Sequence, residues 1–66
     1  MIKTKPEVNQ ESLYNQGEVA AALQIDRHTV AKYERLGYIK FRARKTGGEK
    51  VTNGQAVIKC WEKVYL

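Results

Sequence analysis

The stretch QGEVAAALQIDRHTVAKYERL, residues 16–36, decides the fold of this chain. Its first half places apolar residues on one side of a helix, namely Val19, Ala20 and Leu23. Val30 and Tyr33 define the buried side of a second helix in the same way. The residues between the two helices, 24–26, suffice only for a tight turn. The pattern therefore predicts a helix-turn-helix, in which the second helix presents its other side outward.

The exposed side of the second helix is expected to be basic. Asp26 caps the helix, because its carboxylate accepts backbone N–H bonds, and Gly37 ends it. Thr29 and Leu36 flank the buried side. The opposite arc holds Arg27, His28, Ala31, Lys32 and Arg35. Such an arc suits the major groove of duplex DNA, where base edges and phosphates present mostly acceptors. With Thr29, these residues are our candidates for DNA contact.

These basic residues also have ordinary alternative roles. Arg27 and Arg35 are placed to form surface ion pairs with Glu34 or Glu18, which contribute little stability. His28 has no second histidine and no nearby cysteine in the sequence, so no metal site is expected there.

The first helix has a clear start signal. Asn15 is the expected N-cap, and Glu18 stands three residues later as its capping-box partner. The preceding residues, 1–12, have no apolar periodicity and contain Pro6, which predicts a flexible arm outside a domain spanning residues 13–66.

After Gly37 the pattern changes to that of a β-hairpin. Apolar and basic residues alternate over 39–44, the return strand covers 50–52, and Gly47 and Gly48 permit the turn between them. Residues 40–50 hold five of the twelve lysines and arginines. This hairpin is expected to act as a wing whose basic face contacts the DNA backbone beside the second helix. The candidates are Lys40, Arg42, Arg44, Lys45, Thr46, Gly47 and Lys50. A solvated charged loop is the alternative.

A third helix closes the chain. Thr52, with Gln55 three residues later, is the expected cap, with Asn53 as the alternative. An apolar stripe follows at Val57, Ile58, Trp61, Val64 and Tyr65, with Cys60 at its half-buried edge. Most of the stripe is expected to close the core. Trp61 and Tyr65 are large for so small a core, so they are candidates for weak self-association.

Several protein classes are excluded by the composition. A chain of 66 residues has room for one domain, and its single cysteine excludes an internal disulfide. No apolar run approaches the roughly 20 residues that cross a bilayer, and no signal peptide begins the chain, which predicts a cytoplasmic protein. One histidine, one cysteine and scattered carboxylates form no catalytic pattern. We therefore expect no enzyme, no cofactor and no metal.

Residues 13–65 resemble the small winged helix-turn-helix domains of the excisionase and MerR-like group of phages, mobile elements and bacterial regulators. The matching positions are Val19-Ala20, Leu23-Gln24-Ile25-Asp26, Thr29-Val30, Tyr33, Leu36-Gly37-Tyr38-Ile39, Gly47-Gly48 and Ala56-Val57-Ile58-Lys59. The end of the chain is also similar to the DNA-binding part of lambda-like phage terminase small subunits. Gln24 departs from the glycine that many helix-turn-helix turns carry.

The resemblance implies a fold and a role. The fold is mainly α with a small β-hairpin, the second helix enters the major groove, and the wing contacts the backbone. The implied role is that of an excisionase-like recombination directionality factor or small transcriptional regulator, with a recombinase or RNA polymerase as partner. A terminase domain, which requires the chain to be a fragment, and a protein-interaction module using Trp61 and Tyr65 are the alternatives.

Overall fold

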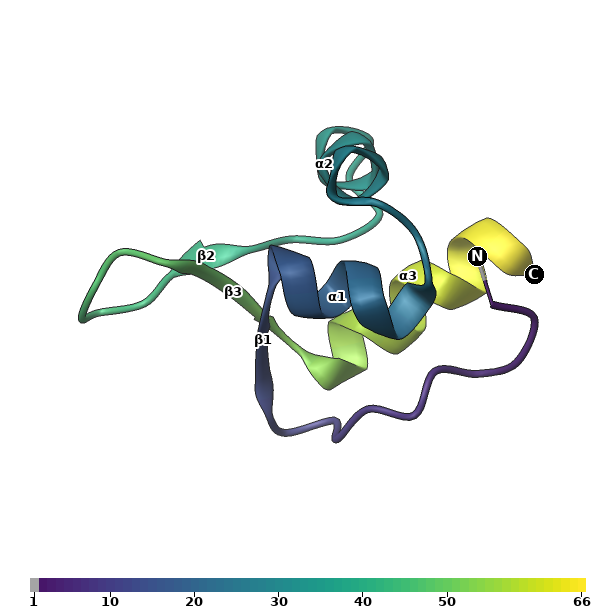
Figure 1. Ribbon diagram of the computed structural model, residues 1–66, viewed down its shortest axis with the longest axis horizontal. Coiled ribbons are helices and arrows are strands. Elements are labelled where there is room, and N and C mark those ends of the chain that lie inside the picture. The colour runs from purple at the N-terminus through teal and green to yellow at the C-terminus, as the bar shows by residue number, and fades with distance from the viewer. Residues whose placement is uncertain (1) are drawn as a thin grey trace.

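Residues 2–66 are described by a computed structural model, and they form three helices and a small three-stranded antiparallel sheet (Figure 1). In chain order the elements are β1 Leu13–Asn15, α1 Gln16–Leu23, α2 Arg27–Arg35, β2 Arg42–Ala43, β3 Lys50–Asn53 and α3 Gly54–Tyr65. The strand order is β1-β3-β2. The chain is thus mixed α and β, and its sheet has one strand more than the predicted hairpin.

The helix boundaries follow from local capping. Asn15 caps α1 through a complete capping box with Glu18, and Asp26 caps α2, as the sequence predicts. Gly37 follows α2 with φ of 82°, which confirms it as the stop signal. The Thr52 cap is wrong: Thr52 is a buried residue of β3, and Asn53 accepts the N–H of Ala56 instead.

The core lies between the three helices. Its buried residues are Val19, Ala20, Leu23, Val30, Ile39, Val57, Cys60 and Trp61. Cys60 is fully buried rather than half-buried at the edge of the stripe, and burial raises the pKa of its thiol. Leu36 is more exposed than predicted: it is expected to flank the buried side of the second helix, but 53% of it is exposed. Within residues 2–66, no helix is both long and apolar enough to cross a membrane.

The segment 2–12 packs along the domain, whereas the sequence predicts a flexible arm. Pro6 is buried, and Ile2 and Val8 pack against the core. The amide N–H of Gly54 donates to the carbonyl of Ser12 over 3.1 Å, which joins this segment to the start of α3. Figure 1 shows the segment lying below α3 and α1, from near the C-terminus to the start of β1. The packed unit therefore includes residues that the predicted domain boundary leaves out.

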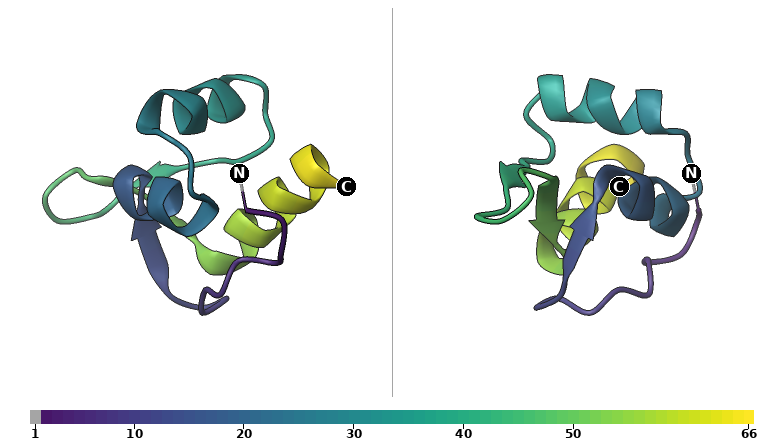
Figure 2. Two further views of the ribbon diagram at one scale, coloured as in Figure 1. Left: turned by 45° about the vertical axis from the view of Figure 1, so that its right-hand side comes forward. Right: turned by 60° about the vertical axis from the view of Figure 1, so that its left-hand side comes forward.

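The β2–β3 hairpin projects beyond the helices (Figures 1 and 2). Its first strand is shorter than the predicted 39–44, because Ile39 turns into the core, with 3% of it exposed, before the pairing begins. The return strand runs one residue further than predicted, to Asn53. The hairpin is thus anchored at its base and free at its loop.

Candidate nucleic-acid interface

The turn between α1 and α2 is held by backbone geometry. Gln24 adopts a left-handed conformation, with φ of 57° and ψ of 47°, at the position where many such turns carry glycine. The N–H of Ile25 then donates to the carbonyl of Ala20 over 3.0 Å. The chain reverses within three residues, and α2 crosses α1 with one face uncovered (Figure 1).

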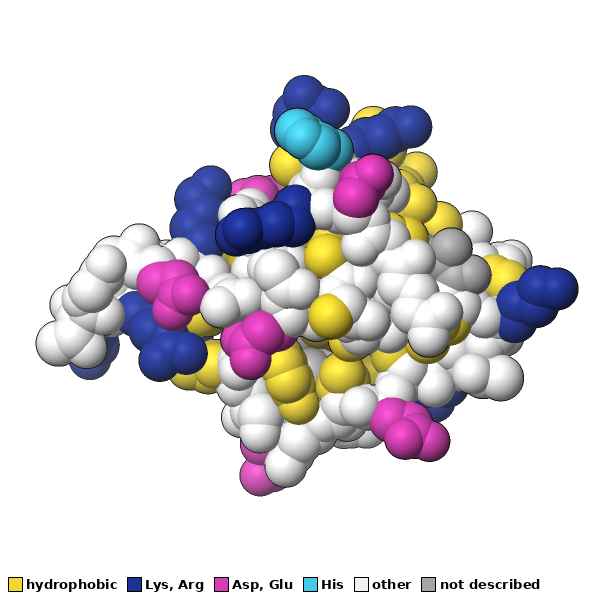
Figure 3. Space-filling model, viewed as in Figure 1, with side chains coloured by type: hydrophobic (Ala, Val, Ile, Leu, Met, Phe, Trp, Pro, Cys, Tyr) yellow, Lys and Arg dark blue, Asp and Glu magenta, His cyan; other side chains and the backbone are white. Residues whose placement is uncertain are grey.

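The outward arc of α2 matches most of the sequence prediction. Arg27, His28, Lys32 and Arg35 are all exposed, whereas Ala31 is half-buried and not part of the open arc. Figure 3 shows Lys, Arg and His side chains gathered over this helix. The surface presents donors to solvent, as contact with phosphates and base edges requires.

Thr29 has a structural role at the start of α2. Its hydroxyl and its backbone N–H both donate to Oδ1 of Asp26, each over 2.8 Å. The hydroxyl bond is the larger cause that holds the pKa of Asp26 below its usual 3.8, and the backbone bond adds to it. The Thr29 hydroxyl is therefore engaged within the helix cap.

Glu34 connects α2 to its neighbours. Its Oε1 accepts from Nε2 of Gln16 over 3.1 Å, and its Oε2 lies 3.4 Å from Nζ of Lys50. Among residues 2–66 the carboxylates pair with Lys50 and Arg44, and no ion pair involves Arg27 or Arg35. Glu34, which the sequence offers as an ion-pair partner for these arginines, instead contacts Lys50 of β3. The sequence contains no local signal for this contact.

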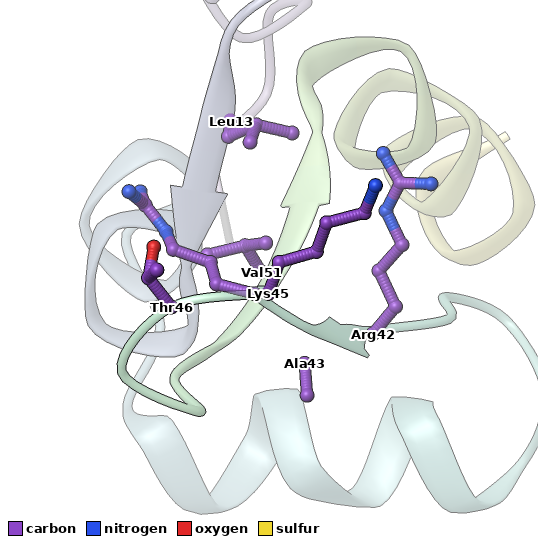
Figure 4. A pocket seen from close by; sticks show the side chains of 7 residues that line it. Leu13, Arg42, Ala43, Lys45, Thr46 and Val51 are labelled. Carbon is purple, nitrogen blue, oxygen red and sulfur yellow. The ribbon is translucent and has the colours of Figure 1, made fainter.

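The basic face of the hairpin is expected beside the second helix, but the structure divides the basic residues between the two faces. Ala43 stands opposite Lys50, which contacts Glu34, so these two residues share the α2 side. Arg42 stands opposite Val51, and because side chains alternate along a strand it lies on the other face. Figure 4 shows Ala43 pointing toward α2, and Arg42 and Lys45 pointing away from it. The prediction that the basic face lies beside the second helix is therefore wrong for Arg42.

The other wing candidates are distributed around the hairpin. Lys40, Lys45, Thr46 and Gly47 are exposed. Gly47 and Gly48 have φ of 86° and 68°, which makes the loop the sharp turn that the two glycines indicate. Arg44 lies 3.7 Å from Glu49, so its charge is partly balanced. Lys50 is the wing candidate that lies against α2, through its contact with Glu34.

Trp61 and Tyr65, the two candidates for self-association, differ in burial. Trp61 is only 8% exposed, and its Nε1 donates to the carbonyl of Ile2 over 3.0 Å, so it belongs to the core. Tyr65 stacks on it, with ring centroids 5.4 Å apart, and is 45% exposed. Within the described chain, no three His, Cys, Asp or Glu residues are grouped as metal ligands.

Comparisons of the chain with known proteins do not assign it to a family. No family model, no curated protein and no solved structure matches the chain.

Proposed function

We propose that this chain is a winged helix-turn-helix protein that binds specific sites in duplex DNA and catalyses no reaction. The observation that carries the proposal is the exposed basic arc of α2, formed by Arg27, His28, Lys32 and Arg35. A helix of nine residues fits the major groove, and the first turn, with Arg27 and His28, is nearest the base edges. Lys32 and Arg35 then reach phosphates.

The hairpin supplies the second contact. Its loop projects beyond the helices, and Lys50 stands on the α2 side of β3. A hairpin in this position meets the sugar-phosphate backbone next to the groove that α2 enters, through Lys50. Gly47 and Gly48 in its loop allow the protein backbone to approach a phosphate closely.

The biological role follows from the resemblance described above. An excisionase-like factor or small regulator of a phage or mobile element acts by placement: copies on adjacent sites bend or coat the DNA for a recombinase or polymerase. The DNA-recognition domain of a terminase small subunit remains the alternative role. All these roles require site-specific binding, which is the property to test first.

Selection of bound duplexes from a random pool tests site-specific binding directly. We expect an enriched motif, and repetition of that motif at helical-turn spacing would indicate copies bound side by side. Titration of the enriched site with salt should give a slope of about −3.6 if four phosphates are neutralised. Binding without an enriched motif would contradict sequence-specific reading, and no binding would refute the proposal as a whole.

Matched variants separate base reading from phosphate contact. Arg27→Ala should cost about 1 to 3 kcal/mol at the enriched site and little on random DNA. Lys32→Ala should weaken binding to both and flatten the salt slope by about 0.9. Lys59→Ala removes the same charge from an exposed position on α3 and is the control. Equal losses for Lys32→Ala and Lys59→Ala would show that only net charge matters.

A further inference from the structure

A hollow of about 530 Å³ opens on the face of the sheet that points away from α2 (Figure 4). We call it the sheet hollow. Its lining residues are Leu13, Arg42, Ala43, Arg44, Lys45, Thr46 and Val51. The DNA-binding proposal uses α2, Lys50 and the hairpin loop, and so leaves most of this hollow without a role.

The floor of the sheet hollow is apolar. Leu13 of β1 is a large hydrophobic residue that is 41% exposed. Val51 of β3 is 1% exposed, yet it lies outside the core cluster between the helices, because it points to the opposite face of the sheet. The register explains this grouping, since Asn15 and Arg42 flank Val51 on either side and Leu13 lies two residues before Asn15. A segment laid here gains stability by covering Leu13.

The rim of the sheet hollow is positively charged. Arg42 and Lys45 point to this face, and within residues 2–66 neither forms an ion pair (Figure 4). Arg44 lies 3.7 Å from Glu49, which also accepts from Nδ2 of Asn15 over 2.9 Å. Glu49 therefore balances one of the three cations, and Arg42 and Lys45 are left to attract negative charge.

We propose that the sheet hollow binds an acidic segment of another protein that also carries apolar side chains. Carboxylates fit Arg42, because guanidinium groups bind them with two parallel hydrogen bonds. An apolar side chain of the same segment covers Leu13, whereas a phosphate backbone has no group that does so. The complementary charges draw the partner to this face and orient it. Because the hollow points away from α2, DNA and the acidic segment bind at the same time.

The probe is a short fluorescent peptide in which glutamate alternates with leucine, added to the whole chain. We expect saturable binding, measured by anisotropy. Arg42→Glu and Lys45→Glu should each weaken it about tenfold or more. Lys59→Glu and Lys63→Glu make the same charge change on α3 and should retain binding within about twofold. A peptide with glutamine in place of glutamate should not bind. Leu13→Gln should also weaken binding, which separates the apolar contact from charge attraction.

Other occupants give different results. If the peptide does not bind, or binds equally well to Arg42→Glu, the proposal is overturned. If duplex DNA displaces the peptide, and Arg42→Glu loses both ligands equally, the hollow belongs to the DNA interface. Sedimentation that shows a dimer, lost in Arg42→Glu, would assign the hollow to a second copy of the chain. Thermal melts of each variant check folding. DNA binding through α2 is measured separately with Lys32→Ala, so failure of one proposal leaves the other testable.

Discussion

The indole N–H of Trp61 donates to the carbonyl of Ile2, with 3.0 Å between Nε1 and oxygen. This bond joins α3 to the first described residue of the chain, and it explains how the apolar stripe of α3 is covered. Ile2 in turn donates its N–H to the carbonyl of Leu23 at the end of α1, over 3.1 Å. The N-terminal segment therefore bridges two helices and completes the core from the side opposite the hairpin.

The first prediction concerns this bond. Trp61→Phe removes the donor and leaves the Ile2 carbonyl without its partner, so the free energy of unfolding should fall by about 1 to 3 kcal/mol. Urea denaturation followed by circular dichroism measures the change. Tyr65→Phe is the control, because Tyr65 is largely exposed and keeps its ring stacking, and it should cost under about 0.5 kcal/mol. If Trp61→Phe leaves stability unchanged but abolishes an oligomer, Trp61 is a surface residue.

The second prediction tests the packing of residues 2–12 against α3. A Cβ added to Gly54 overlaps the carbonyl of Asn9, so Gly54→Ala must displace backbone and should destabilise the fold by about 1 to 3 kcal/mol. Gly17→Ala is the matched control, because its Cβ meets Asn15 Oδ1 at 3.4 Å, an ordinary contact. It should be neutral or stabilise α1 by up to about 1 kcal/mol. Equal stability of the two variants would place the N-terminal segment away from α3.

Local signals account for the elements that the sequence predicts. The caps at Asn15 and Asp26 act within three residues, so their chemistry is visible in the chain itself. The same is true of the glycines that end α2 and turn the hairpin. The basic arc of α2 follows from helical periodicity alone.

Contacts between residues that are distant in the sequence account for the structural features that the sequence does not predict. β1 has only three residues and exists through pairing with β3, so it has no periodic pattern of its own. Pro6 and Val8 look like part of a disordered arm in the sequence, although Val8 packs against the core. The missing side chain at Gly54 makes room for Asn9 and Gln10 beside α3, a contact that no local pattern predicts. The orientation of Arg42 depends on where Ile39 enters the core, which alternation along one strand does not specify. The sheet hollow depends on this orientation of Arg42 and on the pairing of β1 with β3, so the sequence does not predict the hollow either.

A third prediction follows from the turn of the helix pair. Gln24 occupies left-handed backbone space, which costs a non-glycine residue about 1 to 2 kcal/mol. Gln24→Gly should relieve this strain, offset in part by the greater freedom of glycine in the unfolded chain, and raise stability by about 0.5 to 1 kcal/mol. Thermal unfolding measures the gain. Gln24→Ala keeps the backbone strain, so it should not raise stability. If Gln24→Ala raises stability as much as Gln24→Gly, relief of backbone strain is not the cause of the gain.

The fourth prediction is a pH dependence. The Thr29 hydroxyl and backbone N–H hold the pKa of Asp26 below 3.8 in the folded chain. A depressed folded pKa contributes stability that is complete above the unfolded value and is lost as the pH falls through the folded one. Wild type should therefore lose stability relative to Asp26→Asn, whose amide cap does not titrate, as the pH falls below 3.8. A stability difference that is constant across this range would contradict the role of the carboxylate.

The last prediction concerns the carboxylate between the two proposed DNA contacts. Glu34 holds Lys50 at 3.4 Å and accepts from Gln16, so it neutralises part of the basic surface while it positions β3. Glu34→Gln keeps a hydrogen-bonding side chain but frees Lys50 for a phosphate. Affinity for random duplex DNA should rise several-fold, and the salt slope should become steeper by about 0.9. Discrimination between the selected site and random DNA should fall, because Lys50 then binds any backbone.

Glu62→Gln is the control for that prediction, because it removes one negative charge from an exposed position on α3. It should leave the salt slope unchanged and raise affinity only slightly, through the long-range field of the protein. If both variants raise affinity equally, the effect of Glu34 is one of net charge. If neither changes binding, Lys50 does not contact DNA, and the hairpin contribution must come from its loop alone.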